Sequence, residues 1–197
     1  MASIDTEPFI LRETSAGLYR IPLFDDMLER REVELAGEID DDLANSIIRR
    51  LRYLERASAD EPITMYVNSP GGVVSSGLAI YDAMQAVRCP VHTVCQGMAA
   101  SMAAVLFSAG DRRDMMAHAT VMIHDPLIGG GGLTGSATFL DSKVRNLMGT
   151  RELTASLLAK HTGRTIEEIY EKTANDTYFD ADEAIAFGLA DGVLERF

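Results

Sequence analysis

The sequence contains no tryptophan and only two cysteines, Cys89 and Cys95, among its 197 residues. Two cysteines are too few for a disulfide framework, and their spacing matches neither a CxxC redox pair nor a structural zinc site. The acidic runs at 25–26 and 40–42 are typical of solvated helix caps and not of metal ligands. We therefore expect no metal site and a reducing, cytoplasmic environment.

Basic residues are also few, since 18 lysines and arginines face 30 aspartates and glutamates, for a formal net charge of −12. A protein that binds nucleic acid needs cations for the phosphates, and so does a protein held on an anionic membrane surface. The charge balance therefore argues against both kinds of partner.

Long hydrophobic runs are absent as well. The most apolar run, residues 98–107, is far shorter than the roughly 20 residues that span a bilayer, so we expect it to form a buried core helix. The first residues have neither a basic region nor an apolar one, and we expect no signal peptide and no membrane segment.

Several motifs of nucleotide-binding proteins and hydrolases are missing too. The sequence has no GxxxxGKS/T phosphate loop, which excludes ATP hydrolysis by that route, and it has no GxGxxG, HExxH or GxSxG pattern. None of the motifs that are present indicates a cofactor, so we expect none.

The sequence does contain an alternation of strands and helices. Apolar and β-branched runs at 63–67, 91–94 and 120–123 predict strands, and helix-like segments follow them. Such alternation is typical of βαβ units and a mostly parallel sheet. No Pro/Ser-rich linker divides the chain, so we predict an arm or hairpin over residues 1–20 and a single α/β domain over 21–197.

The remaining elements follow from caps and periodicity. Strands are predicted at 32–37 and 192–194, and four consecutive glycines at 129–132 predict a loop before a long helix at 136–161. A short helix is predicted at 23–32, and cap patterns predict further helices that begin near residues 41, 165 and 180.

Residues of chemical interest lie just past the ends of the three strands. They are the pair Gly71-Gly72, then Ser101, then His124. Because ligands of parallel sheets bind at the carboxyl ends of the strands, we expect these residues to converge.

Ser101 stands among small and apolar neighbours at a predicted helix N-terminus. Free N–H groups and the helix dipole favour negative charge there, as an activated nucleophile beside an oxyanion hole requires. On this stretch alone, an ordinary helix cap is the simpler explanation.

His124 is the candidate base for Ser101, because it alone among the four histidines closes a strand beside the Ser101 unit. His161 lies at a predicted helix end, where a cation suits the dipole. A structural role for His124 remains the alternative.

The N–H groups of Gly72 and Met102 are candidate oxyanion donors. A plain turn after Pro70 is the alternative explanation for the glycines.

Four stretches together resemble one known family. They are residues 66–72, 96–102, 121–126 and 161–163, which read YVNSPGG, QGMAASM, VMIHDP and HTG. In this order they resemble the ClpP family, the proteolytic subunit of the ATP-dependent Clp protease. The resemblance covers nearly the whole chain, from about residue 13 to the C-terminus.

The resemblance implies a crotonase/ClpP-like fold of repeated βαβ units with a protruding handle helix, at about residues 125–161. It also implies a serine endopeptidase that degrades unfolded polypeptides to short peptides. In that enzyme, Ser101 is the nucleophile, His124 the general base and Asp176 the acid. The backbone N–H groups of Gly72 and Met102 then form the oxyanion hole.

The resemblance further implies an assembly of two stacked heptameric rings around a closed chamber, with residues 1–20 lining the axial pore. A separate AAA+ ATPase unfoldase would feed substrates into the chamber, which fits the missing phosphate loop. Thr64 and Ala86 stand where larger rings are expected in the clefts that dock the ATPase. A second isoform ring that docks the ATPase is therefore an alternative.

Other positions also depart from the family pattern. Ala103 replaces a glycine, the loop at 129–132 is longer than usual, and Asp125 stands where glutamine is common. The Asp125 carboxylate is a candidate to pair with His124 in competition with Asp176.

Two alternative functions stay open. The first is a catalytically weak structural ring subunit of a hetero-oligomeric protease. The second is an acyl-CoA enzyme of the crotonase type, and the presence of Ser101 and His124 together argues against it.

Overall fold

A seven-stranded sheet lies at the centre of the fold, which a computed structural model describes for residues 8–128 and 134–196. All the described pairings in this sheet are parallel except that of strand β7 with strand β8, which is antiparallel. The α/β fold with a mostly parallel sheet is therefore confirmed. The strands of the sheet are β3 (Glu32–Ala36), β4 (Ile63–Ser69), β5 (Val91–Ala100), β6 (Arg112–Met115), β7 (Thr120–Ile123), β8 (Thr177–Phe179) and β9 (Gly192–Val193).

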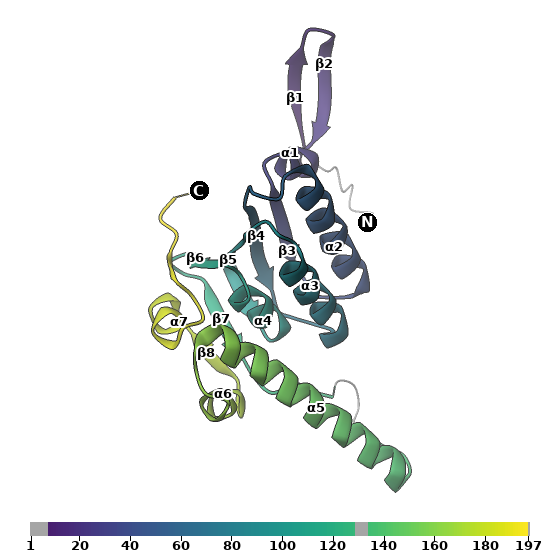
Figure 1. Ribbon diagram of the computed structural model, residues 1–197, viewed down its shortest axis with the longest axis vertical. Coiled ribbons are helices and arrows are strands. Elements are labelled where there is room, and N and C mark those ends of the chain that lie inside the picture. Colours follow the sequence, from purple (N-terminus) through teal and green to yellow (C-terminus); the bar gives the residue numbers. More distant parts are fainter. Residues whose placement is uncertain (1–7, 129–133, 197) are drawn as a thin grey trace, which may run out of the picture.

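Helices cover the sheet, and three of them, α2, α3 and α4, lie next to one another over the face that is turned to the viewer in Figure 1. The buried core lies between these helices and the sheet, where alternate residues of β4 are buried. The helices are α1 (Leu23–Glu29), α2 (Asp41–Ala57), α3 (Val74–Ala86), α4 (Met102–Ser108), α5 (Ala137–Thr162), α6 (Ile166–Thr173) and α7 (Ala181–Phe187).

Side-chain caps confirm the predicted starts of α2, α6 and α7. The Asp40 side chain accepts a hydrogen bond from the Leu43 N–H at the start of α2, at 2.8 Å. Capping boxes begin α6, between Thr165 and Glu168, and α7, between Asp180 and Glu183. Local side-chain chemistry therefore sets where these helices begin.

The boundary between β5 and α4 differs from the prediction. Residues 98–107 were expected to form one core helix, but Met98, Ala99 and Ala100 belong to β5, and α4 begins only at Met102. These three residues pair in parallel with Thr120–Met122 of β7. Pairing with a neighbouring strand outweighs the helix propensity of alanine, and it carries the strand up to Ser101.

Strand β6 was not predicted, because three of its four residues are charged. Ion pairs accommodate these charges at the sheet. Arg112 pairs with Asp114 at 2.7 Å, and Arg113 pairs with Asp191 at 2.5 Å beside β9. Charged residues near a sheet edge are a recognised strand pattern, but they carry no hydrophobic period.

Two elements project from the body in Figure 1, at opposite ends of the view. One is the antiparallel hairpin of β1 (Phe9–Thr14) and β2 (Gly17–Pro22), which extends slightly past the predicted arm. The other is the N-terminal half of α5, where Phe139, Val144 and Met148 are exposed. The division into residues 1–20 and 21–197 stays a prediction. Residues 1–7 of the predicted arm and the glycines at 129–132 lie outside the described residues.

Within the described part of the chain, no helix is long and apolar enough to cross a membrane.

Candidate active site

Ser101 lies at the junction of β5 and α4. Its N–H donates to the Met122 carbonyl at 2.8 Å, which extends the β5–β7 pairing by one step and holds Ser101 beside the end of β7. Its backbone is in an unfavourable region for a residue with a side chain, at φ 56° and ψ −122°. Such a conformation costs on the order of 1–3 kcal/mol and is common at functional sites.

The Ser101 hydroxyl does not cap α4, since the described structure gives it no side-chain bond to that helix. Instead, Ser101 Oγ lies 2.8 Å from His124 Nε2. His124 is the first residue after β7, so the parallel pairing of β5 and β7 brings the two side chains together. This geometry suits proton transfer from the hydroxyl to the imidazole.

Asp176 lies on the other side of the His124 ring. Strands β7 and β8 pair antiparallel, with Ile123 opposite Thr177, and one further step in this register places His124 opposite Asp176. The distance from His124 Nδ1 to Asp176 Oδ1 is 3.5 Å, and the Asp176 side chain is 60% exposed. The three side chains therefore form a row, but the outer contact is longer than an ordinary hydrogen bond.

The first of the two glycines after β4, Gly71, packs against Ser101. Gly71 has φ +93°, and a Cβ there would stand 2.7 Å from the Ala100 carbonyl oxygen and 2.8 Å from Ser101 Cβ. The Gly71 carbonyl and the Val73 N–H both bond to Ile39, each at 2.8 Å. Gly72, between them, lines the same cavity as Ser101 and Met102.

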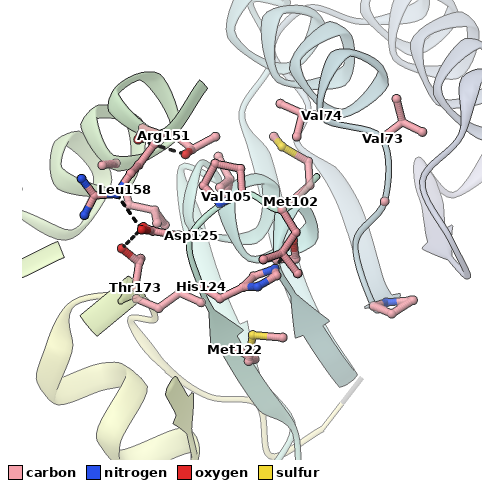
Figure 2. A pocket seen from close by; sticks show the side chains of 18 of the residues that line it. Val73, Val74, Met102, Val105, Met122, His124, Asp125, Arg151, Leu158 and Thr173 are labelled. Atoms are coloured by element: carbon pink, nitrogen blue, oxygen red, sulfur yellow. Dashed lines mark hydrogen bonds and ion pairs between the residues drawn. The ribbon is translucent and has the colours of Figure 1, made fainter. Parts of the chain in front are cut away.

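A cavity of about 550 Å³ opens beside these residues. Figure 2 shows His124 and Met102 at its centre and Leu158 and Arg151 of α5 along another wall. The apolar side chains of the lining come from α3, α4, α5 and β7 and their ends; they include Val73, Val74, Met102, Val105, Met122 and Leu158. The cavity can accept an apolar side chain next to the Ser101 hydroxyl.

Asp125 does not pair with His124, contrary to the expectation that it competes with Asp176. Its carboxylate accepts a hydrogen bond from Arg151 Nε at 2.6 Å and another from Thr173 Oγ1 at 2.7 Å, as the dashed lines in Figure 2 show. The sequence motif around His124 gave no sign of these partners, because Arg151 and Thr173 are far away in the chain.

His161, at the C-terminal end of α5, contacts a distant tyrosine. Its Nε2 lies 2.9 Å from the Tyr81 hydroxyl, 80 residues earlier in the chain. Burial, followed by the charges of Lys160 and Arg113, lowers the pKa of His161 below its ordinary value, so the ring favours its neutral form. The predicted place of His161 at a helix end is confirmed, since it lies in the last turn of α5, but its lowered pKa disfavours the cation there.

One family model matches the chain, the model of the Clp protease, and the match covers residues 15–197. The chain belongs to the Clp protease family. The resemblance found in the sequence motifs is thereby confirmed, and the family identifies the chain as a peptidase of the ClpP type. Members of the Clp protease family oligomerise into rings and work with AAA+ unfoldases.

The sequence analysis did not identify Gly77, which supports the site although it has no side chain. A Cβ on Gly77 of α3 would stand 2.2 Å from Met102 Cγ, so this glycine makes room for the Met102 side chain.

Within the described residues, no cluster of three histidines, cysteines or carboxylates has the arrangement of a metal site.

Proposed function

We propose that this Clp protease family member is a serine endopeptidase whose nucleophile is Ser101. The observation that carries the proposal is the 2.8 Å contact between Ser101 Oγ and His124 Nε2 at a strained backbone position beside an apolar cavity. A helix cap needs neither the strain nor the histidine.

In the proposed reaction, Ser101 Oγ attacks the scissile carbonyl carbon while its proton passes to His124 Nε2. Asp176, on the Nδ1 side, orients the ring and stabilises its cationic form. Collapse of the tetrahedral intermediate breaks the C–N bond, and His124 gives the proton to the leaving amine. Water then attacks the acyl-enzyme by the same steps and releases Ser101.

The developing oxyanion would accept hydrogen bonds from the N–H groups of Gly72 and Met102. Support comes from the position of both residues on the cavity wall beside Ser101, and from the close packing of Gly71 on Ser101. One such donor is worth about 3 kcal/mol in the transition state. The cavity itself favours apolar side chains next to the cleaved bond.

The ring assembly, the handle and the axial arm belong to the same proposal. We expect two stacked heptameric rings that receive unfolded polypeptide from an AAA+ unfoldase in the cytoplasm. The projecting hairpin of β1 and β2 suits the axial arm, and the exposed apolar residues of α5 suit a contact between subunits. A folded, tagged protein should then be degraded only with unfoldase and ATP, whereas short peptides need neither.

Hydrolysis of short fluorogenic peptides tests the catalytic part. The purified assembly should cleave them, and Ser101→Ala should abolish cleavage. Ser75→Ala provides a matched control, because Ser75 is an exposed serine on α3 outside the cavity. Retention of cleavage by Ser101→Ala would remove Ser101 from the mechanism.

A second candidate function is a ring subunit with weak catalysis of its own. The 3.5 Å contact of Asp176 and its large exposure favour it, because the acid is loosely held in this conformation. Full activity of an assembly built from this chain alone would exclude it.

A further inference from the structure

Asp125, the residue after His124, connects three segments of the chain. Arg151 on α5 donates to one of its carboxylate oxygens, and Thr173 at the end of α6 donates to the other. The Asp125 N–H also donates to the Thr173 carbonyl, at 2.8 Å. The side chain and backbone of Asp125 therefore hold the segment just after β7 against both α5 and α6.

Arg151 is itself held in place. Its guanidinium carbon lies 3.8 Å from the centre of the Tyr170 ring on α6, and its side chain is 25% exposed. Figure 2 shows the guanidinium on the side of Asp125 that faces away from His124. A stacked, largely buried arginine restricts its partner more than an exposed ion pair does. Arg145 on the same helix forms such an exposed pair, with Asp141.

The clamp made by Asp125, Arg151 and Thr173 adjoins both the candidate base and the candidate acid. His124 is one residue from Asp125, and Asp176 is three residues from Thr173. The Thr177 hydroxyl donates a hydrogen bond to the Lys172 carbonyl at 2.6 Å and so links the two ends of the short segment between α6 and β8. A shift of Thr173 relative to Asp125 therefore moves Asp176 relative to His124.

Besides the β7–β8 pairing, which sets the register, few contacts position the Asp176 side chain. Asp176 is 60% exposed, and in the described part of the chain His124 is the one partner found for its carboxylate. The distance between base and acid thus depends on how β7 and the end of α6 sit against each other. Asp125 joins these two segments directly and joins both to α5.

We propose that Asp125 is a positioning residue that aligns His124 with Asp176. Through Arg151, it also makes this alignment depend on the position of α5 against β7. The inference rests on the proposed serine peptidase function. A carboxylate suits this position because it accepts from Arg151 and from Thr173 at the same time. An amide here would accept from only one of the two donors with its oxygen and would lose the charge.

Peptide hydrolysis by Asp125→Asn and Arg151→Met assemblies tests the proposal. Each variant should lower kcat about tenfold, because small misplacements of catalytic groups are costly, while KM for a short apolar peptide stays within about twofold. The double variant should be no worse than either single one, since both remove the same contact. Arg151→Lys, which keeps a cation, should recover at least half of the wild-type kcat.

Arg145→Met is the matched control on α5 and should leave kcat unchanged. Assembly size and melting temperature are measured for every variant, and if Asp125→Asn does not assemble, the comparison of Arg151→Met with Arg151→Lys decides. Wild-type kcat in both Asp125→Asn and Arg151→Met, or additive losses in the double variant, would overturn the positioning role. Absence of Ser101-dependent cleavage in the wild type would instead overturn the proposed function.

Discussion

Gly71→Ala should damage the site through the backbone alone, without removing a catalytic group. The added Cβ would stand 2.7 Å from the Ala100 oxygen, 2.8 Å from Ser101 Cβ and 3.0 Å from the Met102 nitrogen. Two of these three atoms are backbone and the third is a Cβ, so no flexible side-chain end can move away. The φ of +93° adds strain for any residue with a side chain.

The magnitude follows from these two effects. A left-handed backbone costs alanine about 1–2 kcal/mol, and the overlap costs about 1–3 kcal/mol, as in overpacked cores. The sum of roughly 2–5 kcal/mol corresponds to a fall of about 5–20 °C in the apparent Tm of a domain this size. Because the overlap falls on Ser101 and the Met102 N–H, kcat/KM should fall by about 100-fold.

Substitutions at two other glycines separate the effect of backbone strain from that of steric overlap. Gly37 has φ +82° with nothing within 4 Å of an added Cβ, and Gly149 lies in α5 with the same open space. Gly37→Ala should lose only about 1–2 kcal/mol and keep its activity, whereas Gly149→Ala should gain about 0.5–1 kcal/mol. Differential scanning calorimetry and peptide hydrolysis measure both effects. A Gly71→Ala protein that behaves like Gly37→Ala would refute the reasoning.

Three further outcomes are expected. Asp176→Ala should lower kcat less than His124→Ala does, because its 3.5 Å contact is long and exposed; equal losses in peptide hydrolysis would contradict this. The pKa of His161 is lowered from 6.5 by burial first, so its contribution to stability is present above that pH and is lost as the pH falls through the folded-state pKa; thermal unfolding should show a decline at acidic pH that His161→Gln reduces, and an unchanged decline would argue against this source. Burial raises the pKa of Cys95 to about 12, so iodoacetamide at pH 8 should label Cys95 only after unfolding, and mass spectrometry showing rapid labelling of the native protein would disprove the assignment.

The strand-end residues could be placed from the sequence because each follows a short hydrophobic run. Ser101, His124 and the glycines lie near one another since parallel strands end at the same edge, a property that needs no knowledge of the exact register. The extent of β5 could not be predicted, because Ala99 and Ala100 are read locally as helix and become strand only through pairing with β7.

Asp176 shows the limit of local reasoning more clearly. No pattern around it marks it as catalytic, and only the resemblance to the family selected it. Its place beside His124 follows from the antiparallel register of β7 and β8, which is set by residues over 50 positions apart. The partners of Asp125 depend in the same way on the packing of α5 and α6.

The identity of the nucleophile is the central claim, and peptide mapping by mass spectrometry after reaction with a fluorophosphonate tests it most directly. The adduct should lie on Ser101 alone in an assembly that cleaves peptides, and His124→Ala should suppress its formation. An adduct on another residue, or none on Ser101 in an assembly that cleaves peptides, would contradict the account.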